Sequence, residues 1–537
     1  MISTDNISLK FGKQTLFKDV SLKFTTENCY GIIGANGSGK STFLKILANE
    51  TEPTTGTVSV DKNKRLGILK QNHFEFDEYT VIDTVIRGHK KLFSIITEKD
   101  ALYAKTDFTD EDGIKTAELE AEFAELNGWD AEIDAAKLLR NLDIPPEVHE
   151  QKMKELPGSE KVKVLLAQAL FHNPDILIMD EPTNNLDIKT KLWLENFLST
   201  YQNTIILVSH DRHFLDKVCT HIVNLDHSLM RIYAGNYTFW TKANELAMEQ
   251  MKNQNKRIET KREELTSFIQ RFSANASKSK QATARKNLLE KLVIEEMEPS
   301  SRCYPHVAFK ASKELGNKIL EITNLTKSNE ESLLFKDFSL TVNKGDKIAF
   351  VGDKLSISAL FNILAGKDKA DSGKYEWGVT TNQTYFPKEN SKYFSKDLNL
   401  IDWLRQYAPN DQKDENFIRS FLGKMLFSGD ETLKKCNVLS GGEKVRCMFA
   451  KMMLAAANVI ILDEPTNHLD IESITSVNNG LINSNCIVLF SSHDYEFINS
   501  IANRIVEITP KGSIDKLMSY EEYIFAPQIK SLKENII

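Results

Sequence analysis

The segment GANGSGKS, residues 34–41, has the residue types and spacing of a phosphate-binding loop. It follows the apolar stretch CYGIIG and precedes STFLKILA, an order that predicts a buried strand, a loop and a helix. Glycines in such a loop let backbone N–H groups approach and cradle phosphate oxygens. Lys40 is therefore predicted to reach the β- and γ-phosphates of a nucleotide, and Ser41 to coordinate Mg²⁺.

A second apolar stretch ends in two carboxylates. The segment DILIMDE, residues 175–181, predicts a buried strand with Asp180 and Glu181 at its end. Asp180 suits the coordination shell of Mg²⁺, and Glu181 suits polarising an attacking water. A phosphate loop combined with this acidic strand end predicts hydrolysis of a nucleoside triphosphate.

The chain contains one α/β module twice. The segment LFKDVSLKF (16–24) returns as LFKDFSLTV (334–342), 318 residues later, and IMDEPTNNLDI (178–188) returns as ILDEPTNHLDI (461–471), 283 residues later. The smaller second offset means that the first module holds about 35 more residues, which fall between Gln71 and Leu156. Residues 97–134 within that surplus carry thirteen acids and three bases, and they predict a small acidic helical insertion. The alternative is an ordinary solvated helix face.

A basic segment separates the two modules. Residues 241–310 carry 14 bases and 9 acids, with helix-forming residues from 241 to about 270 and again in NLLEKLVIEEM. This pattern predicts a helical hairpin, and about 30 helical residues would span roughly 45 Å. Five bases and no acid lie between 265 and 289: Arg271, Lys278, Lys280, Arg285 and Lys286. A basic tip predicts contacts with RNA phosphates, the alternative being a spacer with a merely soluble tip.

Composition narrows the class of protein. The 537 residues suggest three or four structural units, and 41% apolar and 27% charged residues are typical of globular proteins. The six cysteines form no CxxC pair, so we expect neither a zinc site nor a disulfide framework, and we expect a reducing, cytoplasmic compartment. We expect neither a signal peptide nor a membrane span.

In its phosphate loop and its acidic strand end, the chain resembles the ABC-type ATPases. Further matches to that family's motifs are the Q-loop glutamine Gln71, the signature LSGGEK (439–444), the switch histidine His210, the D-loop residues Asp187 and Asp470, and the adenine-stacking Phe11. Two such cassettes without a membrane domain, joined by a helical linker of about 70 residues, resemble the ABC-F family. The linker stretch SFIQRFSANASKSKQATAR is similar to that family's interdomain motif, particularly in its YbiT-like branch.

The resemblance implies an α/β fold of two tandem ABC-type P-loop ATPase cassettes joined by a long α-helical hairpin. The expected parts are a first cassette at 1–240 with the acidic insertion at about 90–135, a linker at 241–312, a second cassette at 313–525 and a C-terminal tail at 526–537. The cassettes of this family pair head to tail, so that each ATP lies between one phosphate loop and the other cassette's signature. Pairing within one chain implies a monomer.

The first composite site contains every residue type that the family uses. The resemblance implies Glu181, His210 and Gln71 as catalytic residues, and Ser41, Gln71 and Asp180 as Mg²⁺ ligands. The residues expected to bind ATP are Phe11, Gly34, Asn36, Gly37, Ser38, Gly39, Lys40, Ser41, Thr42, Ser440, Gly441, Gly442 and Glu443.

The second composite site departs from the pattern on both of its halves. At the offset of 318, Gly352 is kept, but Ile357 replaces a glycine, Ser358 the lysine and Ala359 the Mg²⁺-binding hydroxyl. Further departures are Asn329 at the adenine aromatic, Lys388 at the Q-loop glutamine, and Pro157 and Ser159 in the first signature, while Asp463, Glu464 and His493 remain. We therefore expect one competent site and one degenerate site that binds nucleotide weakly or without turnover.

The resemblance also implies a function. It implies an ATP- and Mg²⁺-dependent factor that binds the ribosomal E site and whose linker approaches the P-site tRNA, rRNA and the peptidyl transferase centre, without membrane or DNA as partner. An antibiotic-resistance factor of the same family is one alternative. The soluble ATPase subunit of a transporter is another, but the basic hairpin would then lack a purpose. A DNA-repair ATPase would need zinc cysteines or much longer coiled coils.

Overall fold

The structure of the chain is a computed structural model. It describes residues 1–537 with the exception of 13, 62–63, 71–73, 106, 185, 273–285, 290–301, 330–331, 468 and 537. The chain divides into two compact units. The first comprises residues 1–186, 190–209 and 214–301, and the second comprises 187–189, 210–213 and 302–537.

Two sheets form the framework of the first unit. An antiparallel sheet contains β1 (Ile2–Phe11), β2 (Gln14–Val20), β3 (Lys23–Phe24) and β5 (Thr55–Val60). The other sheet has the order β10-β9-β4-β8-β7-β6. Its strands are β4 (Cys29–Gly34), β6 (Leu66–Leu69), β7 (Ile176–Asp180), β8 (Thr204–Val208), β9 (His221–Asp226) and β10 (Leu229–Ala234).

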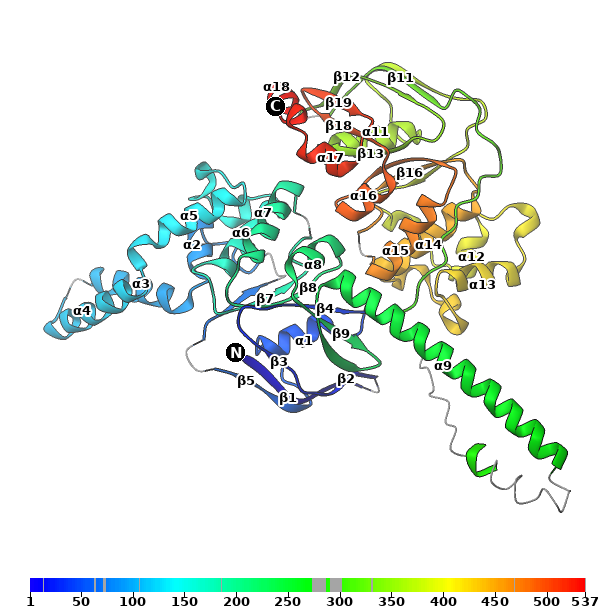
Figure 1. Cartoon of the computed structure of the whole chain (residues 1–537). Helices are drawn as coiled ribbons and strands as arrows, with labels where there is room; N and C mark the ends of the chain where they lie inside the picture. Colours follow the sequence, from blue (N-terminus) through cyan, green and yellow to red (C-terminus); the bar gives the residue numbers. More distant parts are fainter. Residues whose placement is uncertain are drawn as a thin grey trace. The chain divides into compact units, whose positions relative to one another are not determined.

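The strands of the larger sheet are parallel except at β10, which pairs antiparallel with β9. Strand β4, and strand β8 after Thr204, are apolar and buried throughout, as expected where both faces of a parallel sheet are covered. Helix α1 (Lys40–Leu47) lies between the two sheets (Figure 1). Its Phe43 and Leu47 pack in one core with apolar residues of both sheets. The carboxyl end of β4 is thereby fixed against the beginning of α1.

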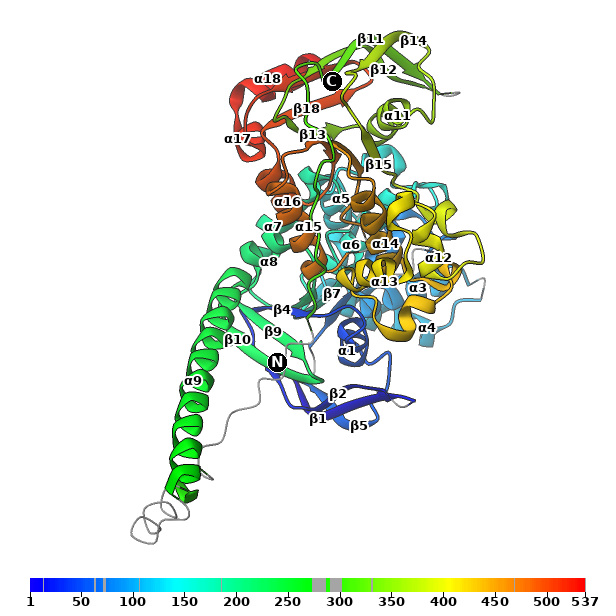
Figure 2. The same cartoon turned by 90° about the vertical axis from the view of Figure 1, so that its right-hand side faces the viewer.

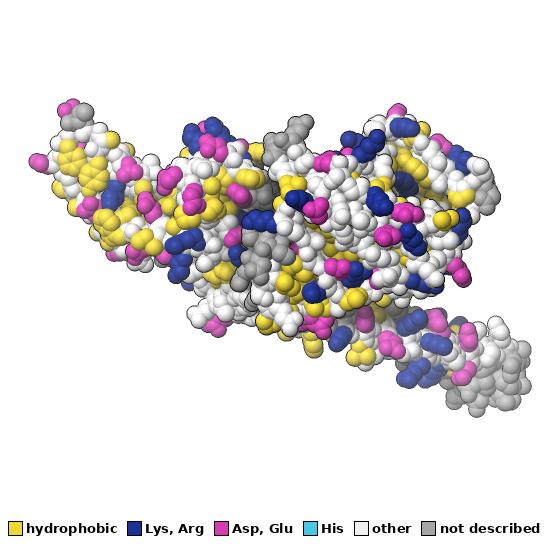
Figure 3. Space-filling view, turned by 90° about the horizontal axis from the view of Figure 1, so that it is seen from above, with side chains coloured by type: hydrophobic (Ala, Val, Ile, Leu, Met, Phe, Trp, Pro, Cys, Tyr) yellow, Lys and Arg dark blue, Asp and Glu magenta, His cyan; other side chains and the backbone are white. Residues whose placement is uncertain are grey.

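Helices cover the rest of the first cassette. They are α2 (Val81–Ile86), α3 (Lys90–Tyr103), α4 (Asp110–Glu125), α5 (Ala131–Asn141), α6 (Gly158–Leu170), α7 (Ile188–Ser199) and α8 (Arg212–Val218), with the 3₁₀ turns Gly128–Asp130, Pro146–Val148 and Met153–Glu155. The surplus segment is thus helical, as its sequence predicts. Thr109 and Asp112 form a capping box that begins α4. Figure 3 shows acidic and apolar side chains next to each other on this insertion, where Ile114 and Trp129 are largely exposed.

A buried histidine begins the insertion. His89 lies at the N-cap of α3, and its Nδ1 accepts a hydrogen bond of 3.1 Å from the backbone N–H of Leu92. This acceptor role requires a neutral ring nitrogen. Burial, and secondarily the charge of Arg65, lowers the pKa of His89 to about 4. The fold therefore holds this imidazole in its neutral form.

The lowered pKa predicts a loss of stability in weak acid. The unfolded chain has a histidine pKa near 6.5 and binds the proton first, so the free energy of unfolding falls as pH drops from about 6.5 to 4 and is unaffected by His89 below that range. We expect this residue to cost about 1–3 kcal/mol across that interval. Melting temperatures of the wild type and His89→Asn should be compared from pH 7 to 4. Asparagine also caps helices but does not titrate, so its pH profile should be flatter. Parallel profiles would contradict the prediction.

One long helix begins the segment between the cassettes. Helix α9 (Tyr237–Phe272) has 36 residues, so it is about 54 Å long at 1.5 Å per residue. Figures 1 and 2 show it as an unbroken helix that follows β10. It begins four residues before the predicted start at 241. Of the predicted second helix, only residues 286–289 are described, and these are helical; the rest lies outside the described residues.

The second unit repeats the two-sheet plan. A three-stranded sheet has the order β12-β11-β14 and a six-stranded sheet has the order β15-β16-β17-β13-β18-β19. The strands are β11 (Leu320–Ser328), β12 (Leu333–Val342), β13 (Lys347–Gly352), β14 (Ser372–Trp377), β15 (Gln383–Phe386), β16 (Val459–Asp463), β17 (Ile487–Ser491), β18 (Arg504–Thr509) and β19 (Gly512–Lys516). The prediction of two tandem α/β cassettes is confirmed.

Helices complete the second unit. They are α11 (Lys354–Leu364), α12 (Leu400–Arg405), α13 (Glu415–Lys424), α14 (Gly441–Leu454), α15 (Ile471–Ile482), α16 (Tyr495–Ile501), α17 (Tyr520–Phe525) and α18 (Pro527–Ile536), with 3₁₀ turns at Ser391–Phe394, Asn410–Gln412, Gly429–Leu433 and Cys436–Val438. Helix α11 shares one core with residues of both sheets, as α1 does in the first unit. The segment expected as a tail thus forms helix α18.

Candidate active site

The backbone of the loop between β4 and α1 adopts conformations that favour glycine. Gly37 and Gly39 have φ of 77° and 105°, a region that other residues rarely adopt. Gly39 is the N-cap of α1, and no side chain caps this helix. The N–H groups of the first turn are therefore available to an anion, which the positive end of the helix dipole also favours.

Lys40 and Ser38 belong to the same loop. The buried ammonium of Lys40 donates to the carbonyl oxygens of Gly34, at 2.7 Å, and Ala35, at 3.1 Å, so it lies across the loop. The buried Ser38 hydroxyl has no hydrogen-bond partner among the residues that the structure describes. A side chain at Gly34 would approach the carbonyl oxygen of Leu225 to 2.7 Å. Glycine at position 34 is therefore required by the close packing against β9, and the unpaired Ser38 hydroxyl fits a site that receives a phosphate group.

The two predicted metal ligands lie together at the carboxyl end of β7. The hydroxyl of Ser41 donates to Asp180. Burial raises the pKa of Asp180, and the Ser41 hydrogen bond and the charges of Lys40 and Lys45 act against that rise. A partly buried carboxylate beside a hydroxyl suits Mg²⁺, which takes few protein ligands together with phosphate oxygens. Ser41 and Asp180 also line a cavity of about 310 Å³.

Glu181 follows in a constrained backbone conformation. Its φ is 52°, in the left-handed region, and its N–H donates to the carbonyl oxygen of Val208 at 2.9 Å. Residues held in this region cost energy and are concentrated at functional sites. His210 follows β8, the strand that neighbours β7, by two residues. The two predicted catalytic side chains therefore begin at the carboxyl ends of neighbouring strands.

The structure describes three of the other predicted residues of the first cassette, Phe11, Asn36 and Thr42, but not Gln71. Phe11 ends β1 with 60% of its surface exposed, so its ring is available for stacking. Asn36 lies in the loop and Thr42 in α1. Gln71 lies outside the described residues, and its predicted roles in catalysis and metal binding stay predictions.

The signature segments differ between the cassettes. Ser440 is the N-cap of α14 and forms a capping box with Glu443, whose first-turn neighbours are Gly441 and Gly442. Burial acts to raise the pKa of Glu443, but hydrogen bonds from Ser440 and Lys434 lower it overall. In the first cassette, Pro157 is the N-cap of α6, and no side chain caps that helix. Ser159 lies in its first turn. The pairing of each signature with the other cassette's loop remains a prediction.

The equivalent loop of the second cassette is folded differently. Strand β13 ends at Gly352, and α11 begins at Lys354. Asp353 is the N-cap, and its carboxylate accepts hydrogen bonds from the Ser356 N–H, at 2.8 Å, and hydroxyl, at 2.6 Å. Ile357, Ser358 and Ala359, which stand at the degenerate positions, are therefore helical. Asn329 lies exposed just after β11.

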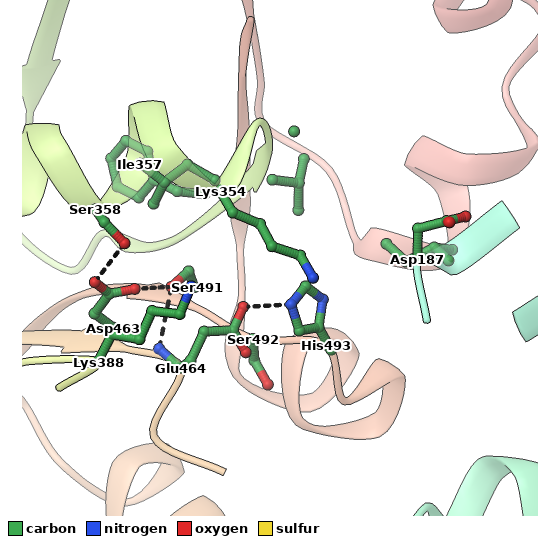
Figure 4. A pocket seen from close by; sticks show the side chains of 14 residues that line it. Asp187, Lys354, Ile357, Ser358, Lys388, Asp463, Glu464, Ser491, Ser492 and His493 are labelled. Carbon is green, nitrogen blue, oxygen red and sulfur yellow. Dashed lines mark hydrogen bonds and ion pairs between the residues drawn. The ribbon is translucent and has the colours of Figure 1, made fainter. Parts of the chain in front are cut away.

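The acidic strand end of the second cassette is bonded to neighbouring side chains (Figure 4). Asp463 accepts from Ser358 at 2.8 Å and from Ser491 at 3.1 Å. Glu464 has φ of 50°, close to the value at Glu181, and its Oε1 lies 2.8 Å from Nε2 of His493. Lys388 and Lys354 line the same cavity, whose volume is about 90 Å³. The carboxylates of the motif are kept, but their surroundings are altered.

The sequence interpretation missed Asp353 and Lys354. The signal was present, because an aspartate directly before an apolar helical pattern is typical of an N-cap. The N-cap pattern at Asp353 was not recognised because the segment was interpreted as a degenerate phosphate loop. Ser491, which donates to Asp463, was also missed, since its role depends on the pairing of β16 with β17.

Of the predicted RNA contacts, two residues lie in described helical segments. Arg271 belongs to α9, but its side chain lies outside the description, and Lys286 is exposed. Lys278, Lys280 and Arg285 lie outside the described residues. In the part of the chain that the structure describes, no helix combines the length and the apolar character needed to cross a membrane.

Comparison with known proteins agrees with this geometry. The sequence profile described as ABC transporter matches residues 17–184 and 335–467, and an extension profile with the same description matches residues 223–309. Among solved structures, the archaeal ribosome recycling factor aABCE1, in complex with the ribosomal stalk protein aP1, has a TM-score of 0.64 and 18% identity. The match covers 98% of this chain and 92% of that chain, and it supports the fold alone.

Several curated proteins are similar over nearly their whole length. The uncharacterized ABC transporter ATP-binding protein YkpA of Bacillus subtilis is 58% identical, covering 98% of this chain and 97% of that protein. The probable ATP-binding protein YbiT of Escherichia coli is 45% identical, covering 98% and 99%. The energy-dependent translational throttle protein EttA of Haemophilus influenzae is 30% identical, covering 95% and 93%.

Proposed function

Because the chain belongs to the ABC-F family of ABC ATPases, we propose that it is a translation factor whose binding to the ribosome is controlled by ATP. The chain is an ATPase by family membership, and the intact phosphate loop of its first cassette supports that activity. The observation that carries the proposal is the combination of this site with helix α9 in a chain related throughout its length to a translational throttle protein.

The first cassette supplies the chemistry. Its loop N–H groups and Lys40 bind the β- and γ-phosphates. Ser41, Asp180 and Gln71 would hold Mg²⁺, which would supply positive charge against those phosphates. Glu181 orients the attacking water and accepts its proton, and His210 contacts the γ-phosphate side of the site. Ser440, Gly441, Gly442 and Glu443 of the second cassette complete the site when the cassettes close. The degenerate site binds nucleotide weakly or does not turn it over.

ATP acts as a switch because it binds the closed arrangement of the cassettes more tightly than the open one. Closure orients the linker for the ribosomal E site. Hydrolysis then removes the interactions that favour closure, and the factor leaves. The difference in affinity between the two states sets how far ATP can shift the equilibrium.

The linker meets RNA. The basic linker residues Arg271, Lys278, Lys280, Arg285 and Lys286 contact backbone phosphates of rRNA and the P-site tRNA. The acidic insertion binds a basic ribosomal protein, because acidic and exposed apolar side chains lie together on the surface of the insertion (Figure 3). The factor works as a monomer in the cytoplasm, with neither membrane nor DNA as partner.

Ribosome co-sedimentation tests the proposal. The Glu181→Gln protein, which should bind ATP without hydrolysing it, is expected to pellet with 70S ribosomes in Mg·ATP and to stay in the supernatant in Mg·ADP. Lys40→Ala is the control and should not pellet with either nucleotide. An absence of pelleting by Glu181→Gln while its ATP binding is intact would refute ribosome binding as the function.

A further inference from the structure

The junction between strand and helix differs in length between the two cassettes. In the first cassette, the five residues 35–39 separate the end of β4 from the beginning of α1. In the second, Asp353 alone separates β13 from α11. Both strands end at equivalent glycines, Gly34 and Gly352. Helix α11 therefore begins four residues, about one turn, before the position equivalent to the start of α1.

This early start uses the backbone donors that a phosphate would need. The N–H groups of Ser356 and Ile357 stand at the positions of Ser38 and Gly39. The Ser356 N–H donates to the Asp353 carboxylate at 2.8 Å, where the Ser38 N–H of the first cassette donates to the Ala35 carbonyl oxygen at 3.2 Å. The Ile357 N–H donates to the Asp353 carbonyl oxygen at 3.0 Å. The left-handed glycines that shape the first loop have no counterpart within α11, since Leu355 and Ile357 stand at their positions. A phosphate cradle and this helical turn cannot coexist.

A carboxylate already lies at the positive end of α11. Asp353 accepts two hydrogen bonds from Ser356, so its charge is fixed at the helix N-terminus. That end of a helix attracts anions, and a second anion there would be repelled by the first. In the first cassette, the corresponding residue is Ala35, which has no charge. The chain therefore provides its own anion where nucleotide phosphate would bind.

Two serine hydroxyls bond the carboxylate that would hold the metal ion, and the residue equivalent to Ser41 has no hydroxyl. Both carboxylate oxygens of Asp463 accept hydrogen bonds, one from Ser358 and one from Ser491 (Figure 4). Burial raises the pKa of this carboxyl group, and the Lys388 ammonium is among the groups that act against that rise. Ala359 cannot supply the hydroxyl that Ser41 offers in the first cassette. The adjoining cavity has a volume of about 90 Å³, against about 310 Å³ for the cavity that Ser41 and Asp180 line in the first cassette.

We propose that the second cassette holds neither ATP nor Mg²⁺, because its own side chains occupy the places of both, and that a single ATP operates each cycle. Asp353 stands in for the phosphate, and Ser358, Ser491 and Lys388 stand in for the metal ion. The inference deepens the proposed function, whose degenerate site could still bind nucleotide. It follows that closure of the cassettes depends only on the ATP bound at the first phosphate loop.

Binding stoichiometry tests the inference. Equilibrium dialysis of the full-length Glu181→Gln protein with radiolabelled ATP and Mg²⁺ should give one ATP per chain at saturation. Adding Lys40→Ala should remove that ATP, whereas adding Lys354→Ala, which deletes the only basic side chain of the second loop segment 352–360, should leave one. Two ATP per chain, or one that survives Lys40→Ala, would overturn the inference.

Metal counting provides a second readout on the same protein. With Mn²⁺ in place of Mg²⁺ and saturating ATP, electron paramagnetic resonance should count one bound ion per chain, and two would overturn the inference. Neither experiment contains ribosomes. A failure of ribosome binding would therefore leave these stoichiometries unchanged, so the two proposals can fail separately.

Discussion

Replacing Glu181 with glutamine is expected to lower the ATP turnover of the full chain by about 10²–10⁴-fold, the usual contribution of a general base. Glutamine keeps the size of the side chain and the backbone conformation at φ of 52°, but it cannot accept a proton from water. ATP binding should persist, because the phosphate loop and Asp180 are unchanged. Phosphate release under saturating ATP and dialysis with labelled ATP would separate turnover from binding.

Glu464→Gln is the matched control. Glu464 ends the equivalent strand with φ of 50° and lies 2.8 Å from His493, so the exchange makes the same chemical change in a similar backbone. We expect turnover to stay within about twofold of the wild type, because the second cassette lacks a phosphate loop, and a twofold change is under 0.5 kcal/mol. Equal losses in the two variants would show that both sites hydrolyse ATP and would contradict the assignment.

Removing Arg504 is expected to destabilise the second unit by about 3–5 kcal/mol, the range for breaking a buried ion pair. Its guanidinium donates to Asp515 at 2.8 and 2.5 Å, to Asp346 at 2.8 Å and to the Thr341 carbonyl oxygen at 3.0 Å. The side chains of Arg504 and Asp346 are only 10% and 11% exposed. Arg504→Met would leave the Asp346 carboxylate buried without its counter-charge.

Hydrogen exchange can measure this effect locally, which matters because a chain of two units need not unfold in one step. In Arg504→Met, the amide protons of β13 and β18 should exchange faster than in the wild type, because the native state of this unit is less stable. The control is Lys318→Met in the same unit, whose ion pairs with Glu321 and Glu376 are about half exposed or more. Such surface pairs contribute about 0–1 kcal/mol. Similar changes in both variants would contradict a special role for Arg504.

The sequence predicted the fold well because the module is repeated. Two copies of one pattern of strands and helices, with the same acidic strand end, predict two tandem α/β cassettes, and the structure confirms them; the order of the strands was not predicted. Helix α9 was predicted four residues short at its start because Tyr237 was assigned to the preceding cassette. Propensity alone does not decide between the last turn of a module and the first turn of a linker.

Prediction of the candidate site was uneven for a physical reason. Lys40, Ser41 and Asp180 could be predicted because each belongs to a short motif with a recognisable spacing, and their roles stay predictions. Asp353 was missed because it matters through the conformation of the next turn, and Ser491 because it reaches Asp463 from a neighbouring strand. An offset alignment compares residue types, whereas a helix that begins one turn early changes what those residues can bind.

Central to the proposed cycle is that one ATP, hydrolysed in the first cassette, releases the factor from the ribosome. Fluorescently labelled wild-type protein should be loaded onto 70S ribosomes with ATP, and its dissociation should be followed in the same rapid-mixing experiment as phosphate release. We expect equal rates for the two processes and one phosphate released per departing protein. Dissociation before phosphate formation, or two phosphates per protein, would contradict this cycle.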